Sequence, residues 1–375
     1  MIYLYYTDQF MAYNFGPEHP LQPVRLMLTY RLIEEYGLLD SYETETVEPY
    51  FADEADLHLV HTLEYIEAVR SEMPDLAYGL GIDDNPVFEG IYEASSLVAG
   101  SSIDAAKRLI EEDCSAFNIG GGLHHAMPSQ ASGFCIFNDP ALAICILKRR
   151  FNKILYLDVD CHHGDGVQQI FYGDPGVLTV SIHESGKYLF PGTGFIDELG
   201  TGEGLGYSVN LPMPMYIHDG PYISAFDEIV PALFEWFKPD AVVTQLGVDT
   251  HYSDPLTSLN LTLSGYREII TRIKRLIDEH GSGRWLALGG GGYNIELVPL
   301  AWAIVFQIMT GRSIPDALPS WWVDYCSTML GRSRESLVDI APGYIRMGDD
   351  EIISGELNET IKDLKVSLNN IHGIF

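Results

Sequence analysis

The chain has 375 residues, 46% of them hydrophobic, so it can bury the core of one large domain or two ordinary ones. Its net charge of −31 argues against binding to nucleic acids or anionic membranes, because both need a basic surface. Five cysteines without a CxxC pair, no signal-peptide pattern and no membrane-spanning apolar stretch predict a cytoplasmic protein with reduced thiols. The acidic surface either attracts cationic substrates or serves solubility alone, and the oligomeric state is not indicated.

Short apolar strands alternate with helical patterns along most of the chain. The predicted strands are 2–7, 115–120, 153–160, 177–183, 241–247 and 284–290. The predicted helices are 24–39, 89–112, 139–151, 222–237 and 263–280. Apolar runs flanked by helices indicate an α/β fold with one parallel sheet buried on both faces, which we expect over residues 1–315. Residues 316–375 lose this alternation, and we predict that they form a helical appendage packed on the same domain.

Unusual polar segments stand at the ends of four predicted strands. GGGLHHA follows the strand at 115–120, and DVDCHHGDG ends the strand at 153–160. GVDTHYSDP follows 241–247, and GGGGYN follows 284–290. Because ligands of open parallel sheets bind outside the carboxyl ends of the strands, the four segments predict one functional site at that edge.

The segment DVDCHHGDG is typical of a metal site. Asp158 and Asp160 point to the same side of the strand, and His162 follows if the extended geometry continues, whereas Cys161 faces away and serves packing. Two such close carboxylates repel each other unless a cation lies between them. Carboxylate and imidazole ligands suit Zn²⁺, Fe²⁺ or Mn²⁺, and a catalytic zinc site has three protein ligands with one open position. We predict Asp160 and His162 as two ligands and Asp249, from another strand end, as the third.

The tandem histidines of GGGLHHA are candidates for proton transfer. A neutral imidazole accepts a proton near physiological pH, and a carboxylate orients its ring and stabilises its charged form. Asp158 and Asp165 are the spare carboxylates on the facing segment, so we predict two His–Asp pairs with His124 and His125. His163 is predicted to turn back into the core.

The glycine-rich segment LALGGGGYN lets the backbone approach the site closely and lacks the GxxxxGK[ST] pattern of a phosphate-binding loop. Tyr293 follows the glycines, and its hydroxyl can donate a hydrogen bond to a developing oxyanion; the alternative is a rim aromatic with a structural hydrogen bond. A metal, a histidine base and a tyrosine donor together predict metal-assisted hydrolysis of an amide.

With these motifs in this order, together with FPGTG, PEHPLQPVRL and LVHTLEYIEAV, the sequence resembles the zinc-dependent histone deacetylase superfamily. It is most similar to the acetoin-utilisation-type members of bacteria and archaea. The resemblance covers residues 1–315 and implies an arginase/deacetylase-type fold. It also implies an enzyme that removes acetyl or other acyl groups from lysine side chains of proteins and peptides.

The resemblance implies a role for individual residues. Asp160, His162 and Asp249 correspond to the metal ligands, His125 to the proton shuttle and Tyr293 to the tyrosine that stabilises the transition state. The metal is expected to be Zn²⁺, with Fe²⁺ as the alternative in the cell.

The resemblance also implies a substrate tunnel and a structural K⁺ site. The residues that correspond to the tunnel walls and substrate contacts are Gly133, Phe134, Phe190, Leu256 and the rim aspartate Asp83. The K⁺ site corresponds to the side chains of Asp158 and Ser181 with the carbonyl groups of Asp160, His162 and Ile182. Arg25 matches an arginine that lines an internal channel below the metal.

Two positions bear on the subtype. Asp165 stands where several related subgroups have asparagine, which favours a class I-like pattern. Polyamine-specific relatives have a glutamate where this chain has Leu256, which favours an acetylated protein or peptide as the substrate.

Three alternatives remain open from the sequence. A ureohydrolase of the arginase type would bind two manganese ions, but the chain lacks the expected DxD doublet after residue 247. A deacetylase of acetylpolyamines or other small amides would use the same mechanism, and the acidic surface favours it. A module that binds acyl-lysine without turnover would not need Tyr293.

Overall fold

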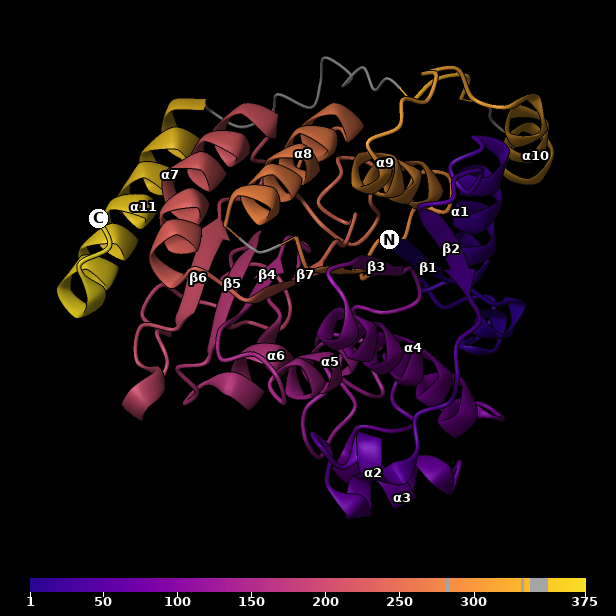
Figure 1. The fold of residues 1–375 in the computed structure, drawn as a ribbon, viewed down its shortest axis with the longest axis horizontal. Helices are drawn as coiled ribbons and strands as arrows, with labels where there is room; N and C mark the ends of the chain where they lie inside the picture. Colours follow the sequence, from indigo (N-terminus) through magenta and orange to yellow (C-terminus); the bar gives the residue numbers. More distant parts are fainter. Residues whose placement is uncertain (281–282, 332–333, 338–349) are drawn as a thin grey trace.

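The computed structural model describes residues 1–280, 283–331, 334–337 and 350–375, and its centre is an eight-stranded parallel sheet (Figure 1). The strand order is β2-β1-β3-β8-β7-β4-β5-β6, and every neighbouring pair is parallel. The strands are β1 (Ile2–Tyr5), β2 (Thr44–Val47), β3 (Ser115–Asn118), β4 (Ile154–Asp158), β5 (Val177–Glu184), β6 (Ser208–Met213), β7 (Ala241–Gln245) and β8 (Trp285–Leu288). The predicted α/β class with one parallel sheet is confirmed.

Helices cover both faces of the sheet, as Figure 1 shows. One layer contains α1 (Val24–Glu35), α7 (Asp219–Phe237), α8 (Leu263–His280) and α9 (Val298–Thr310). The other contains α4 (Ile91–Glu111), α5 (Asp139–Leu147) and α6 (Asp165–Phe171), with α2 (Glu54–Leu57) and α3 (Leu63–Arg70) beyond them. Short 3₁₀ helices are η1 (Asp8–Ala12), η2 (Leu76–Tyr78) and η3 (Gly202–Gly204). Within the described ranges, every helix is too short or too polar to cross a membrane.

The structure differs from the predicted elements mainly at the two edges of the sheet. The edge strands β2 and β6 were not predicted. The two middle residues of β2 are exposed, so it lacks the apolar run that marks a central strand. Pro212 interrupts the pattern of β6, and a proline is tolerated there because an edge strand needs fewer backbone donors. The predicted helix 24–39 ends early because Gly37 adopts a left-handed conformation with φ of 64°.

The C-terminal residues form two further helices at opposite ends of the sheet, α10 (Ser320–Leu330) beside α1 and α11 (Asp350–His372) beside α7 and β6 (Figure 1). Arg31 of α1 lies over the ring of Trp321, 4.7 Å from its centroid. Lys365 of α11 donates to Glu228 of α7 at 2.7 Å. The helix α11 therefore covers the edge of the sheet beside β6.

Helix α4 packs so closely on the segment before α2 that a methyl group cannot be added at Gly100. A Cβ at this position would overlap the carbonyl oxygen of Tyr50 and the amide of Ala52. We expect Gly100→Ala to destabilise the protein by about 3 kcal/mol, the upper range for overpacking a core. Gly355 of α11 is the matched control, because a Cβ there meets no atom within 4 Å beyond the backbone of its own helix.

Gly355→Ala should raise the free energy of unfolding by about 1 kcal/mol, because alanine has the higher helix propensity. Thermal unfolding of both variants checks the prediction, which requires shifts of opposite sign. A Gly100→Ala protein as stable as wild type would contradict this packing.

Candidate active site

Three predicted metal ligands lie together beyond the carboxyl ends of β4 and β7. Asp160 and His162 follow β4, and Asp249 follows the adjacent β7. One ligand atom from each residue lies within 4.8 Å of the others, and all three residues are buried. Nδ1 of His162 is 2.9 Å from Oδ2 of Asp249 and 3.1 Å from Oδ1 of Asp160. The three side chains thus converge on one point.

Hydrogen bonds fix the orientation of both carboxylates. Oδ2 of Asp160 accepts from Nε2 of Gln245 at 2.6 Å and from the amide of Gly291 at 2.8 Å. Oδ1 of Asp249 accepts from the amide of Cys161 at 2.8 Å. A Cβ at Gly291 would overlap Oδ2 of Asp249, so only glycine allows the 289–292 backbone to approach this closely. Gln245 was missed by the sequence analysis, although a buried amide at a strand end before GVD is a usable signal.

The electrostatics of this cluster fit a divalent cation. Burial and the nearby charge of Asp160 raise the pKa of Asp249 to about 7, although His162 opposes the shift. Such a shift is the response of two carboxylates that lack sufficient positive charge between them. Two carboxylates and one imidazole leave coordination positions for a substrate and a water molecule. The donor set and the repulsion between the carboxylates both fit a catalytic metal.

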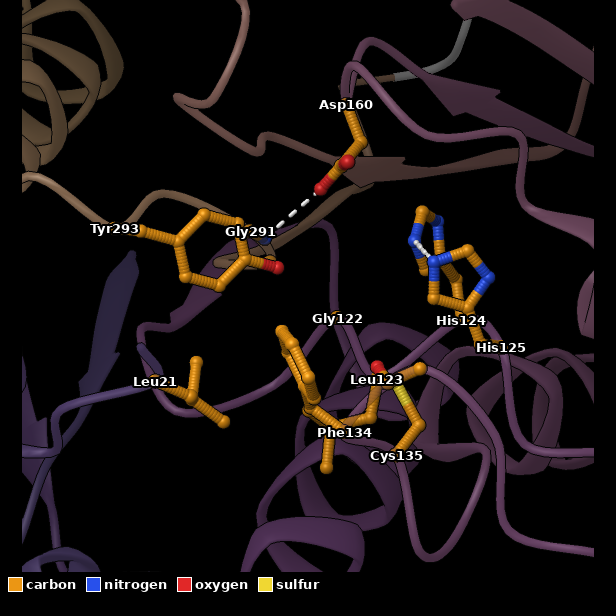
Figure 2. Close-up of a pocket in the computed structure, with 12 residues that line it drawn as sticks. Leu21, Gly122, Leu123, His124, His125, Phe134, Cys135, Asp160, Gly291 and Tyr293 are labelled. Carbon is orange, nitrogen blue, oxygen red and sulfur yellow. Dashed lines mark hydrogen bonds between the residues drawn. The ribbon is translucent and has the colours of Figure 1, made fainter. Parts of the chain in front are cut away.

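The tandem histidines form the two predicted pairs with aspartates. Nδ1 of His124 is 2.7 Å from Oδ2 of Asp158, and Nδ1 of His125 is 2.7 Å from Oδ1 of Asp165. The two Nε2 atoms are 3.0 Å apart (Figure 2). Each carboxylate thus fixes the orientation of one ring.

The two histidines differ in pKa. Burial opposes protonation of His124, but the charges of Asp158 and Asp160 outweigh it and raise the pKa to about 9. Burial and repulsion by His124 lower the pKa of His125 to about 4, against the attraction of Asp165. His125 is therefore the neutral member of the pair, with an imidazole able to accept a proton.

Tyr293 stands on the far side of the cavity from the histidines. Figure 2 shows its hydroxyl pointing into the space between Asp160 and the histidine pair. Its amide donates to Oδ2 of Asp254 at 2.8 Å, and Arg25 donates to the carbonyl of Gly292 at 2.9 Å. Burial and the charge of Asp249 raise the pKa of the tyrosine well above its ordinary value, so the phenol stays a hydrogen-bond donor.

An outer cavity of about 270 Å³ leads to these residues. Its lining includes Asp84, His125, Gly133, Phe134, His162, Leu189, Phe190, Leu256 and Tyr293. The predicted wall residues Gly133, Phe134, Phe190 and Leu256 are therefore all brought together.

Among the residues that line the site, Asp84, Leu21 and Cys135 were not predicted as site residues. Asp84 lines the outer cavity and the predicted rim aspartate Asp83 does not. The contact of Asp83 with the substrate backbone stays a prediction. Leu21 and Cys135 line the inner part of the site, and neither was predicted as a site residue, although Leu21 belongs to the motif PEHPLQPVRL. A Cβ at Gly133, where φ is 51°, would overlap the ring of His125, so glycine is required beside the histidine.

Other residues of the same motifs lie outside the catalytic cavity. His163 is buried and interacts with Oγ1 of Thr193 at 2.8 Å and Oε1 of Gln168 at 3.1 Å. Cys161 is fully buried, with its thiol 3.6 Å from Glu184. The positions predicted for K⁺ are adjacent, because Asp158 of β4 pairs with Ser181 of β5, next to Ile182.

Comparisons with known proteins agree with this geometry. Residues 19–309 match the family model of the histone deacetylase domain. The chain is 41% identical over 354 residues to the acetoin utilization protein AcuC of Bacillus subtilis, covering 90% of each chain. It is 38% identical over 329 residues to AcuC of Staphylococcus xylosus, covering 85% of each chain.

Solved structures show the same fold. A histone deacetylase homologue crystallised in complex with SAHA is 31% identical, with a TM-score of 0.86 over 97% of this chain and 99% of that one. A homologue from Aquifex aeolicus is 30% identical, with a TM-score of 0.85 over the same shares. The matched domain spans both histidine pairs, the three clustered ligands and Tyr293. The chain therefore belongs to the histone deacetylase family, a family of metal-dependent hydrolases, and is similar to AcuC proteins.

Proposed function

We propose that this protein is a metal-dependent deacetylase that hydrolyses the side-chain amide of acetyl-lysine in proteins or peptides. The observation that carries the proposal is the convergence of three groups on one site. They are the cluster of Asp160, His162 and Asp249, the neutral imidazole of His125, and the hydroxyl of Tyr293. A module that only binds acyl-lysine has no need of a proton acceptor and an oxyanion donor on opposite sides of one cavity.

The proposed mechanism assigns one task to each side chain. A bound divalent metal supplies Lewis acidity and lowers the pKa of water. His125 accepts a proton from the water that attacks the carbonyl carbon, and Tyr293 donates a hydrogen bond to the resulting oxyanion. The carbon–nitrogen bond then breaks, His125 returns the proton to the lysine nitrogen, and acetate is the second product. Asp165 holds the ring of His125 in place throughout, through the hydrogen bond at Nδ1.

Zinc is the proposed metal, with Fe²⁺ as the alternative in the cell, since both accept two carboxylates and one imidazole. We also propose a structural K⁺ at Asp158 and Ser181, with the carbonyl groups of Asp160, His162 and Ile182. A cation there would offset the negative charge of Asp158, which is fully buried and already interacts with His124 and Tyr156. We also propose that the protein works in the reducing cytoplasm. The five free cysteines support this location.

The lining of the outer cavity favours a lysine side chain over a cationic polyamine. The rings of Phe134 and Phe190 and the side chain of Leu256 give it apolar walls, which suit the methylene chain of acetyl-lysine. A polyamine would carry a second ammonium group close to Leu256, with no carboxylate at that position to receive it. The acidic Asp84 at the same cavity favours the polyamine instead, which makes the small-amide deacetylase the second candidate.

Leu256→Glu tests the choice between the two substrates. Leu256 is 38% exposed, so a glutamate can replace it without entering the core. We expect kcat/KM for an acetylpolyamine to rise about tenfold relative to an acetyl-lysine peptide, because one new charge pair at a partly desolvated site contributes roughly 1–2 kcal/mol. The measurement is the ratio of the two kcat/KM values in each enzyme, and Leu256→Gln is the uncharged control. A wild-type enzyme that hydrolysed only the polyamine would contradict the proposed substrate.

A further inference from the structure

A second cavity, of about 310 Å³, lies directly beside the catalytic one. Its lining consists of Ser253, Pro255, Tyr293, Asn294, Ile295, Glu296 and Leu330. Leu330 is the last residue of α10 and lies outside the matched family domain, which ends at residue 309. The C-terminal part of the chain thus contributes to a cavity that adjoins the active site.

The two cavities share a wall. Tyr293 lines both of them, and the neighbouring residues Pro255 and Leu256 line one cavity each. Consecutive Cα atoms are about 3.8 Å apart, so one short stretch of backbone at Pro255–Leu256 forms part of the wall between the two cavities. Side chains two positions apart in an extended peptide point to the same side at a spacing of about 7 Å. A peptide that crosses the Pro255–Leu256 wall can therefore place one side chain in each cavity.

The chemistry of the second cavity favours an apolar side chain. Pro255, Ile295 and Leu330 provide apolar surface from three separate segments. The polar groups of Asn294 are already used, because its Nδ2 donates to Oγ of Ser253 at 2.9 Å and its Oδ1 accepts from the amide of Glu296 at 3.1 Å. The same hydrogen bonds fix the loop at 293–296, which lines the cavity.

We propose that this cavity is a substrate subsite that binds the apolar side chain of the residue two positions before or after the acetyl-lysine. This inference rests on the proposed function, since an acetylpolyamine has no such residue. It assigns part of the substrate selectivity to Leu330, a residue of the C-terminal segment. Apolar burial in the subsite adds to the selectivity that the catalytic cavity provides for the acyl-lysine itself.

Matched peptides test the subsite. Each peptide has one acetyl-lysine and carries leucine, serine or lysine two positions before or after it; an isolated Nε-acetyl-lysine amide serves as the minimal substrate. For the better of the two positions, wild type should show about tenfold higher kcat/KM with leucine than with serine, the effect of burying a few methylene groups. Leu330→Ala should reduce this ratio to about two, whereas Met329→Ala should leave it unchanged. Met329 is the matched control because it precedes Leu330 on α10, is 63% exposed and does not line the cavity.

The ratio is taken within one preparation, so it does not depend on folding or metal loading. Equal rates with leucine and serine at both positions, alongside turnover of the minimal substrate, would overturn the subsite and leave the proposed function intact. A preference for the lysine peptide would overturn the apolar assignment and point to Glu296 as the recognition group. An acetylpolyamine is assayed beside the peptides, and its turnover without turnover of any peptide or of the minimal substrate would overturn the proposed function and the subsite together.

Discussion

Replacing Tyr293 by phenylalanine is expected to lower kcat for an acetyl-lysine peptide about 100- to 1,000-fold, the range for loss of one oxyanion donor. The phenol remains protonated because burial and the charge of Asp249 raise its pKa, and its hydroxyl points into the catalytic cavity (Figure 2). Phenylalanine keeps the ring that packs edge-on against Phe134, with the two ring centroids 5.7 Å apart. The walls of the cavity should therefore be preserved.

Steady-state kinetics and metal analysis of the same Tyr293→Phe preparation check this expectation. KM and metal content should change little, because the hydroxyl is not among the clustered metal ligands. A variant with wild-type kcat would show that the hydroxyl does not act in the transition state. It would also restore the interpretation of Tyr293 as a rim aromatic.

Replacing His125 by alanine is expected to lower kcat/KM about 100- to 10,000-fold, the usual contribution of a general acid–base residue. The imidazole is held by Asp165 at 2.7 Å and lines both the inner and the outer part of the site. Its removal leaves a space beside Gly133 and Phe190, into which a small base can diffuse.

Added imidazole should therefore restore part of the activity of His125→Ala in a concentration-dependent manner. The rescue distinguishes a proton-transfer role from a structural one, because free imidazole cannot repair a misfolded site. Thermal unfolding of the variant serves as the control for folding. A folded variant whose activity imidazole does not restore, or a folded variant with full activity, would each contradict the assigned role.

The sequence predicted the centre of the sheet and the chemistry at its edge for the same physical reason. Central parallel strands such as β4 and β7 are apolar throughout, so polar residues at their ends stand out and must meet at one edge. The edge strand β2 carries no such pattern. In the other edge strand, β6, Pro212 interrupts the pattern. The hydrophobic pattern and the position of the strand ends therefore predicted that Asp160 and Asp249 lie at one edge of the sheet. They did not predict the strands at the borders of the sheet.

Residues that act through tertiary contacts were harder to predict. Gln245 holds Asp160, and Asp254 holds the backbone of Tyr293, yet neither of them was assigned a role from the sequence. Leu21 and Leu330 reach the site from segments far away in the chain, where nothing but the fold brings them near. The position of Asp84 in the lining of the outer cavity was equally hard to predict, because a turn and not a periodic element decides which side chain lines it.

The most direct test of the account is to titrate Zn²⁺ into metal-free protein while following bound metal and hydrolysis of an acetyl-lysine peptide. The account predicts that turnover rises in proportion to occupancy and reaches its plateau at one catalytic ion per chain, and that Asp249→Ala shows neither tight binding nor turnover. Full activity of the metal-free protein, or no turnover at full occupancy, would contradict the claim that Asp160, His162 and Asp249 form a hydrolytic metal centre.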